Sequence, residues 1–336
     1  MAGLLPRLLP DFLISSRSRL FRIEDEAILA SRAGFHKERC ASIALGTSLG
    51  AMPHASRIDG FDEPRLDESG LKEQVRDFWN ADPCGSRYLA DQADFEAHAR
   101  ARYKLEPYIH EFAGFAQSRG QRVLEVGVGM GADYLEWLKA GALAAGVDLS
   151  DISLERAKRR CEMAGYMSDL RVSDAEHLPF PANTFDVVYS YGVMHHSPDT
   201  PRCIREAWRV LKPGGALRIM IYHQPSLTGY MLWLRYGFLR GKSVRQSVHD
   251  YLESPGTKSY TQEEAQAMLQ GFEGIEMRQV FAPGDLLLNK PSARFRGWGY
   301  RLIWQFYPRF FIRRFGAKLG LFLLISARKT GGLART

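Results

Sequence analysis

Three closely spaced glycines follow a short apolar segment, and a carboxylate stands just ahead of them. Residues 123–131 read VLEVGVGMG, which places Glu125 two residues before the first glycine, Gly127. Glycine lets the backbone turn tightly and approach a ligand where a Cβ atom would clash. A helix that begins directly after the glycines would also point unpaired N–H groups at that ligand. The segment therefore predicts a loop that binds a small molecule.

A second carboxylate, Asp148, closes the next apolar segment, seventeen residues after Gly131. A carboxylate at this position can accept hydrogen bonds from both hydroxyl groups of a ribose. The pattern Gly127-x-Gly129-x-x-Ala132 also fits a dinucleotide fingerprint, so the glycines and Asp148 alone leave NAD(P) open. Glu125 argues against NAD(P), because a carboxylate there would repel the pyrophosphate of a dinucleotide. The same carboxylate suits the ammonium group of S-adenosylmethionine.

Strand-like and helix-like segments alternate through the middle of the chain, and they must position these residues. Such alternation predicts an α/β fold, with a doubly wound, mostly parallel sheet covered by helices on both faces. Ligands bind such sheets at the carboxyl ends of the strands, where the glycine loop is expected. Strands are expected at 122–126, 144–148, 169–172, 185–189 and 216–222, with two more near 274–281 and 321–327 that would complete a seven-stranded sheet.

The rest of the chain is expected to be arranged around this core at 119–222. Residues 1–65 form an N-terminal extension, expected to be poorly ordered. Residues 66–118 are expected to form helices, one from residue 71 and a second over about 95–118. Phe78 and Trp79 of the first helix could form a lid over the site or pack in the core. Residues 223–260 are expected to form a cap insertion. Residues 261–336, opened by a Thr261–Glu264 capping box, end the sheet and hold a basic, aromatic insertion at 282–318.

The composition is that of an ordinary globular protein, with 45% hydrophobic and 25% charged residues. Four scattered cysteines without a Cys-x-x-Cys pair argue against a zinc site or a disulfide framework, so no metal and a cytoplasmic location are expected. The net charge of +7 is uneven, because residues 291–336 hold ten Lys and Arg and no acid. The excess of positive charge is therefore confined to the C-terminal segment, whereas a typical nucleic-acid-binding protein is basic more uniformly.

Further motifs follow the second strand in a fixed order. They are Asp174-Ala175, the Leu-Pro-Phe of 178–180, the Phe-Asp-Val-Val of 185–188, the Gly-Val-Met-His-His of 192–196 and the Lys-Pro-Gly-Gly of 212–215. With the glycine loop, this series resembles the class I S-adenosylmethionine-dependent methyltransferases, and within them the small-molecule branch that includes the ubiquinone and menaquinone methyltransferases. The resemblance covers about residues 120–222 and implies a Rossmann-like fold.

The resemblance also implies which residues hold the cofactor, S-adenosyl-L-methionine. In the family an acid precedes the glycine turn, a second acid binds the ribose, and an acid followed by a small residue reads the adenine. The corresponding residues here are Glu125, Gly127, Gly129, Gly131, Asp148, Leu149, Asp174, Ala175 and Ser190.

Two adjacent histidines, His195 and His196, are the first candidates for catalysis. Methyl transfer needs a base only when the acceptor is a hydroxyl group or an acidic carbon, and histidine titrates in the right range. Tyr222 and His223, at the end of the fifth strand, are second candidates. The alternative is that the histidine pair only packs against the cofactor or caps a helix.

The acceptor class is narrowed by the sequence Ser190-Tyr-Gly-Val193. Enzymes that methylate amino groups of bases or glutamine resemble one another in an Asp/Asn-Pro-Pro-aromatic element at this place, which is missing here. A small molecule methylated on oxygen or carbon is therefore favoured, and a nucleic-acid partner is not. An NAD(P)-dependent oxidoreductase, an RNA methyltransferase and a binding module without catalysis remain as alternatives.

Arginines and aromatic residues are interleaved in the C-terminal segment, and residues 230–242 have the same character. Such mixtures suit the headgroup level of an anionic membrane, although aromatic residues at this spacing also pack onto sheets. No apolar run reaches the ~18–20 residues of a membrane-spanning helix. We therefore expect, at most, peripheral contact with an anionic membrane through the basic aromatic segment, and a lipophilic acceptor would agree with it.

Overall fold

The computed structural model describes residues 68–81, 91–254, 256–288 and 305–331. The chain divides into two compact units, residues 1–63 and 64–336, and every described residue belongs to the second unit. The expected N-terminal extension at 1–65 lies outside the described residues, and so does the part of the basic aromatic insertion at 289–304.

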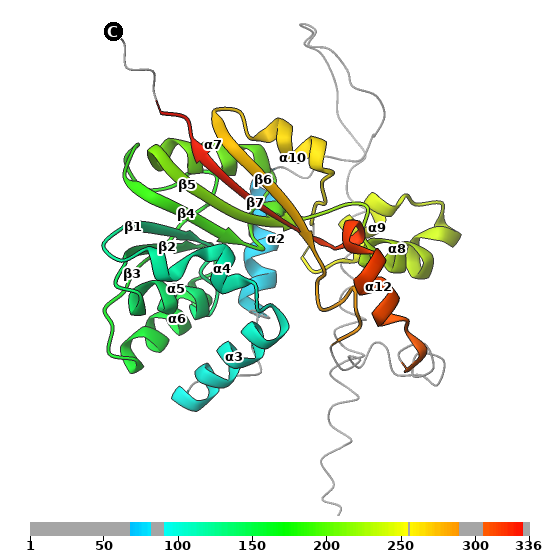
Figure 1. Cartoon of the computed structure of the whole chain (residues 1–336), viewed down its shortest axis with the longest axis horizontal. Helices are drawn as coiled ribbons and strands as arrows, with labels where there is room; N and C mark the ends of the chain where they lie inside the picture. The colour runs from blue at the N-terminus through cyan, green and yellow to red at the C-terminus, as the bar shows by residue number, and fades with distance from the viewer. Residues whose placement is uncertain (1–67, 82–90, 255, 289–304, 332–336) are drawn as a thin grey trace, which may run out of the picture. The chain divides into compact units, whose positions relative to one another are not determined.

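A seven-stranded sheet forms the centre of the unit, in the order β3-β2-β1-β4-β5-β7-β6 (Figure 1). The first five strands run parallel, and β7 runs antiparallel to both of its neighbours. The prediction of a mostly parallel, doubly wound sheet is confirmed. The strands are β1 (Arg122–Val126), β2 (Leu143–Asp148), β3 (Asp169–Val172), β4 (Phe185–Tyr191), β5 (Leu211–Tyr222), β6 (Phe272–Val280) and β7 (Phe322–Lys329).

Helices cover both faces of the sheet (Figure 1). On one face, α7 (Thr200–Val210) and α10 (Gln262–Met268) pack on a cluster that includes Leu124 and Val188. On the other face, α4 (Ile109–Ala113) and α5 (Ala132–Lys139) pack on Val123 and Val187. The opposite orientation of consecutive residues such as Val123 and Leu124 is the alternation expected of a strand buried on both faces.

The largest differences from the sequence prediction concern one helix and one strand. The helix expected over 95–118 is divided into α3 (Gln92–Leu105), α4 and the short η2 (Phe115–Gln117). Pro107 explains the first break, because its ring disfavours a helical conformation at the preceding residue. The second break is at Gly114, where φ is +69°. Strand β5 begins at Leu211 instead of residue 216, because the chain pairs with Phe185 before a register shift and resumes its pairing with Val187.

The helices at the carboxyl edge of the sheet lie near the glycine loop. Residues 68–81 form α2 (Glu68–Ala81), and α6 (Asp151–Met163) follows β2 with Ser150 as its N-cap. A short turn, η3 (Met194–His196), follows β4. After β5 the described chain is helical, as expected for a cap, with α8 (Leu227–Leu232), η4 (Trp233–Gly237), η5 (Phe238–Arg240) and α9 (Val244–Tyr251). Before β7 lie α12 (Arg309–Phe315) and η7 (Ala317–Leu319).

Candidate functional site

A cavity of about 200 Å³ opens at the carboxyl ends of β1, β2 and β4. Seven of the nine residues predicted to bind the cofactor line this cavity, which brings together segments that are far apart in the sequence. They are Glu125, Gly127, Gly129, Asp148, Leu149, Asp174 and Ala175. Ser190 and Gly131 do not line it.

Ser190 requires a correction, because its side chain is fully buried inside the fold. It lies within β4, and its hydroxyl has no hydrogen-bond partner among the described residues. The strand continues to Tyr191, and the residues that follow, Gly192 and Val193, line the cavity instead. The sequence prediction ended the strand at residue 189, and this placed Ser190 at the cavity.

The three glycines of the loop all have positive φ, but each is required for a different reason. A Cβ atom on Gly127 would lie 2.0 Å from the side chain of Val193, so this glycine permits close packing with the loop after β4. No atom lies within 4 Å of a Cβ on Gly129, which faces open space at the cavity. A Cβ on Gly131 would lie 2.8 Å from Cβ of Ala157 in α6.

Gly131→Ala should therefore reduce the stability of the fold and leave ligand affinity at the cavity nearly unchanged. Overpacking of this kind costs about 1–3 kcal/mol, and thermal unfolding with calorimetry would measure both quantities. Gly165→Ala is the matched control, since Gly165 has φ +81° and open space around its Cβ direction. An equal loss of stability in the two variants would contradict the contact with Ala157.

The carboxylate of Asp148 is held at the cavity wall by backbone donors. Its Oδ2 accepts from the N–H of Gly129 at 2.8 Å, and its Oδ1 accepts from the N–H of Ser150 at 2.8 Å. Burial raises the pKa of Asp148, and these N–H donors oppose the increase. The second strand is thereby joined to the glycine loop, and the carboxylate faces the cavity between them.

Glu125 is almost fully buried, and its Oε2 has no hydrogen-bond partner among the described residues. Burial, with the nearby Asp133 adding to the effect, raises the pKa of Glu125 well above its ordinary value. A buried acceptor without a donor is costly unless a ligand completes it. Since Glu125 lines the cavity, it suits a ligand that carries an ammonium group.

An ion pair that the sequence analysis missed stands beside Glu125. From α3, Arg102 donates through Nε and Nη2 to the two oxygens of Asp133, at 3.0 and 2.6 Å. The hydroxyl groups of Tyr103 and Tyr189 also donate to Asp133, at 2.9 and 2.8 Å. Arg102 and Asp133 line the cavity. They are 31 residues apart, and no sequence motif includes both, so only the packing of α3 on α5 brings them together.

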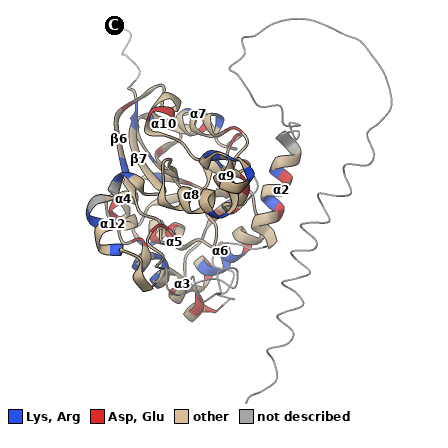
Figure 2. Ribbon diagram, turned by 90° about the vertical axis from the view of Figure 1, so that its right-hand side faces the viewer, with Lys and Arg blue, Asp and Glu red and all other residues tan. Residues whose placement is uncertain are grey.

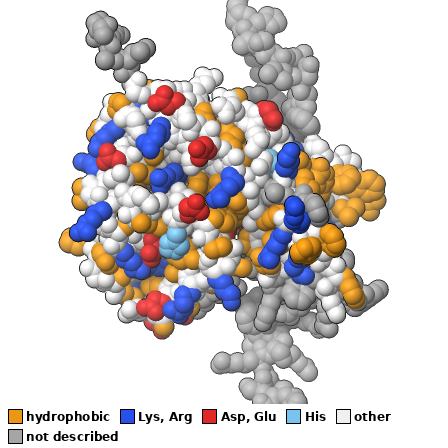
Figure 3. Space-filling model, in the orientation of Figure 1, with side chains coloured by type: hydrophobic (Ala, Val, Ile, Leu, Met, Phe, Trp, Pro, Cys, Tyr) orange, Lys and Arg blue, Asp and Glu red, His pale blue; other side chains and the backbone are white. Residues whose placement is uncertain are grey.

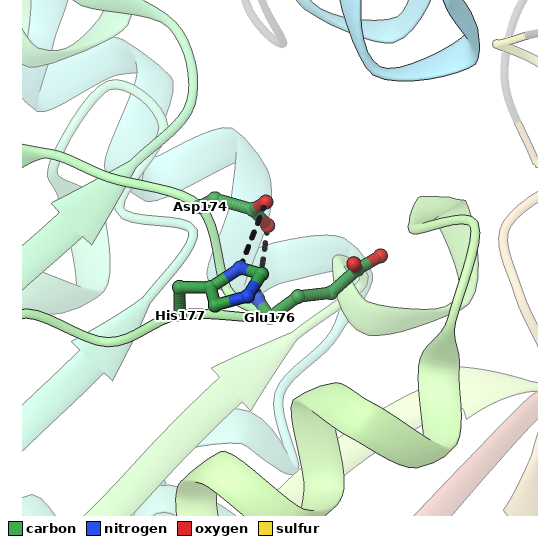
Figure 4. A group of neighbouring side chains, drawn as sticks. All are labelled: Asp174, Glu176 and His177. Carbon is green, nitrogen blue, oxygen red and sulfur yellow. Dashed lines mark hydrogen bonds and ion pairs between the residues drawn. The ribbon is translucent and has the colours of Figure 1, made fainter. Parts of the chain in front are cut away.

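The loop after β3 carries Asp174, Glu176 and His177, which group closely (Figure 4). Lys72 of α2 lies against the two carboxylates, with Nζ 2.7 Å from Asp174 and 2.5 Å from Glu176. Burial alone would raise the pKa of Asp174, but the Lys72 ammonium holds it below its ordinary value. A lysine thus stands where three such groups could otherwise attract a cation.

Helix α2 covers one side of the cavity through Lys72, Val75 and Trp79. The ring of Trp79 meets His196 edge-on, with centroids 5.4 Å apart, and Phe78 packs against Trp79 without lining the cavity. Of the two aromatic residues that suited a lid, Trp79 is the one at the cavity.

The two histidines of η3 differ in their surroundings, and only His196 lines the cavity. His195 has no exposed surface, and its ring lies against that of Tyr222, with centroids 3.9 Å apart. Burial, with His196 adding to the effect, lowers the pKa of His195 well below its ordinary value, so its ring is neutral. The position of His195 is that of a packing residue, which corrects the expectation that it acts on the acceptor.

The Nδ1 atom of His196 lies 2.8 Å from Oγ of Ser254 and 3.0 Å from Oγ1 of Thr257. The Thr257 hydroxyl donates its proton to the carbonyl of Ser254, so its oxygen is left to accept from Nδ1–H. Nε2 of His196 has no hydrogen-bond partner among the described residues, and Oε2 of Glu253 lies 3.5 Å away. When Nδ1 carries the proton and donates to these hydroxyl oxygens, Nε2 keeps a lone pair.

The second candidates for catalysis do not line the cavity. The Tyr222 hydroxyl donates to Oε2 of Glu253 at 2.7 Å, and so it supports the carboxylate beside His196. His223 is buried, and its Nδ1 lies 3.1 Å from the carbonyl of Gly320. Its position is therefore structural.

The sequence matches the methyltransferase domain family over residues 124–219. Residues 124–219 form a class I S-adenosylmethionine-dependent methyltransferase domain. Its cofactor is S-adenosylmethionine. The matched residues include the glycine loop, Asp148, the loop after β3 and both histidines.

The similarity to known proteins extends over only part of this chain and part of each of theirs. A sterol 24-C-methyltransferase of Pneumocystis carinii is 33% identical over 42% of this chain and 38% of its own. A demethylmenaquinone methyltransferase of Symbiobacterium thermophilum is 32% identical over 45% of this chain and 61% of its own. The solved structure of a phospholethanolamine N-methyltransferase 2 of Haemonchus contortus has the same fold. Its TM-score is 0.50 at 21% identity, and the match covers 76% of this chain and 60% of its own. The match spans less than two thirds of each.

The residues of the methyltransferase domain fit S-adenosylmethionine. Glu125 offers an unpaired buried oxygen to the ammonium group, and the open face of Gly129 leaves room for the ligand. Asp148 can accept the ribose hydroxyls. Asp174 and Ala175 stand where the adenine is expected, and Lys72 shares the Asp174 carboxylate.

Proposed function

We propose that this protein transfers a methyl group from S-adenosylmethionine to an oxygen or carbon atom of a small, lipophilic molecule. The observation that carries the proposal is the position of His196, which lines the same cavity as the predicted cofactor residues and whose Nε2 makes no hydrogen bond to the described residues. A base at that place is required for a hydroxyl or an acidic carbon.

The cofactor supplies a methyl group that its sulfonium already activates. The protein therefore has to align donor and acceptor, and such alignment can supply roughly 7–11 kcal/mol of the barrier at best. The glycine loop, Asp148 and Glu125 fix the donor on one side of the cavity. Trp79 and Val75 of α2 line the cavity with apolar surface from another side.

In the proposed reaction His196 takes the proton of the acceptor at Nε2, while Nδ1–H stays bonded to the hydroxyl groups of the cap segment. The positive charge that develops on the imidazole is then close to Glu253. Burial by itself would raise the pKa of Glu253, but the protonated His196 ring and the Tyr222 hydroxyl hold it below its ordinary value. Glu253 is therefore ionised at neutral pH and can stabilise the charged ring.

Glu253→Gln should lower kcat by roughly tenfold, which corresponds to about 1.4 kcal/mol of the barrier, and leave cofactor affinity unchanged. The substitution removes the charge and keeps the size of the side chain. Glu264→Gln is a suitable control, because Glu264 forms an exposed ion pair with Arg245. If kcat is unaffected by the Glu253→Gln substitution, Glu253 takes no part in the reaction.

The class of acceptor is supported by the relatives, whose names are those of enzymes acting on a sterol and on demethylmenaquinone. Both acceptors are lipophilic, and the first name specifies methylation at a carbon. Transfer of labelled methyl groups to lysate extracts tests the proposal. Label in the organic phase supports it, whereas label that nuclease releases would favour RNA, and no labelled product at all would favour a binding module.

We also propose a cytoplasmic location with peripheral contact at membranes. Within the described ranges, no helix combines the length and apolarity needed to cross a bilayer. Cell fractionation would check the location, and recovery in an extracellular fraction would contradict it.

A further inference from the structure

Two segments expose large hydrophobic side chains that a globular fold normally buries. Twelve such side chains are exposed among the described residues, and seven of them lie on residues 230–239 and 306–311. They are Tyr230, Leu234, Phe238, Leu239, Phe306, Phe310 and Phe311. Leu239 is 91% exposed and Phe310 74%. Scattered exposed residues need no explanation, but a concentration of this kind marks an interaction site.

The two segments lie on the same side of the unit, the side that faces the viewer in Figure 2. The fully buried Asp285 fixes both of them. Its Oδ1 accepts from the N–H and the hydroxyl of Thr228 at the start of α8, at 2.9 and 2.7 Å. Its carbonyl accepts from the hydroxyl of Tyr307 at 2.8 Å, just before α12. The segments thus present their side chains from a fixed support.

Basic residues accompany the exposed hydrophobic ones, as the right-hand edge of Figure 3 shows. No Asp or Glu occurs between residues 224 and 249 or between 286 and 336. The exposed cations on these segments and directly after them are Arg235, Arg240, Arg313, Arg314 and Lys318. We call these cations and the seven hydrophobic residues the basic apolar surface. It complements a partner that is both negatively charged and apolar.

The composition of this surface distinguishes among such partners. Single-stranded nucleic acid stacks its bases on aromatic rings, but Leu234 and Leu239 offer no ring for stacking. A second copy of the chain would bring like charges together, which is unfavourable. An anionic bilayer meets both requirements, because aliphatic and aromatic groups enter the headgroup boundary while arginines stay at the phosphates.

We propose that the basic apolar surface binds anionic lipid bilayers and takes the methyl acceptor from them. The second part rests on the lipophilic acceptor proposed above. The cap that carries Leu234 and Leu239 continues through α9 to Glu253 and Ser254, which contact His196. The surface and the base are therefore connected by one continuous segment, residues 234–254.

Vesicle flotation tests the lipid contact with the full chain. The protein should float with vesicles of phosphatidylglycerol and phosphatidylcholine in equal parts, stay behind with pure phosphatidylcholine, and dissociate from the anionic vesicles at high salt. Arg313→Gln with Arg314→Gln should weaken binding about fivefold for each arginine. Phe310→Ser with Phe311→Ser should weaken it further, since two apolar groups no longer enter the boundary.

Matched controls lie elsewhere on the unit. Lys158→Gln removes an exposed cation of α6, and Met167→Ser removes a side chain that is 95% exposed. Both controls should float like the wild type. Affinity for S-adenosylhomocysteine should be the same in all variants, so a failure of the lipid contact is separate from a failure of the cofactor site.

Several outcomes would overturn the lipid contact. They are an absence of flotation with anionic vesicles, equal binding to neutral vesicles, and equal losses in the control variants. Binding to single-stranded RNA without binding to vesicles would also overturn it, as would concentration-dependent dimerisation that the Phe310 and Phe311 substitutions abolish. If methyl transfer to an acceptor in vesicles is no faster than transfer to an acceptor in detergent, the acceptor is not taken from the bilayer. The lipid contact itself would then still stand.

Discussion

Asp148→Ala is expected to weaken the binding of S-adenosylhomocysteine by roughly 100- to 10,000-fold. The carboxylate would otherwise accept two ribose hydroxyls, and hydrogen bonds to a charged group contribute about 1.5–3 kcal/mol each. The substitution also releases the N–H groups of Gly129 and Ser150, which hold the loop at the cavity. Titration calorimetry measures the affinity, and circular dichroism checks that the fold persists.

Gly129→Val is expected to give the same result for a different reason. Its Cβ would point into open space at the cavity, so the branched side chain is expected to occupy the place of the ligand. The positive φ of 54° adds some strain. Asp169→Asn serves as the control for both variants, because Asp169 is an exposed carboxylate at the start of β3. Unchanged affinity in either variant would show that the cofactor binds elsewhere.

His196→Ala is expected to lower kcat by roughly 10²–10⁴ and to leave cofactor affinity close to that of the wild type. The reason is that His196, unlike its neighbour His195, lines the cavity, and its Nδ1 side is held by Ser254 and Thr257. Single-turnover measurements with the identified acceptor separate the chemical step from product release.

His195→Ala provides the contrast. Its buried ring fills space between His196 and Tyr222, so its removal should cost about 2–4 kcal/mol of stability through the cavity that it leaves. At a temperature where the fold is intact, kcat should stay within a few-fold of the wild type. If His195→Ala abolished turnover and His196→Ala did not, the two roles would have to be exchanged.

The sheet and the cofactor loop could be predicted from the sequence because their signals are local. The apolar runs of β1 and β3 indicated the strand boundaries to the residue, and the glycine spacing located the turn. Glu125 and Asp148 could be placed at the cavity because the carboxyl ends of parallel strands lie together.

Long-range packing could not be predicted in this way. Lys72 reaches Asp174 across 102 residues, and Arg102 reaches Asp133 across 31, with no periodic pattern to indicate either pair. The distinction between His195 and His196 depends on a short turn that orients two neighbouring side chains differently. Glu253 was missed for the same reason, because it lies on a segment without a recognisable motif.

The contact between Gly127 and Val193 has a consequence for the coordination of binding with transfer. Val193 begins the turn that carries His196, and its carbonyl accepts from the His196 N–H at 2.9 Å. Since no side chain fits between Gly127 and Val193, the loop that holds the donor and the turn that holds the base are in direct contact. We therefore expect a shift of either one to displace the other, so that binding of the cofactor helps to align the base.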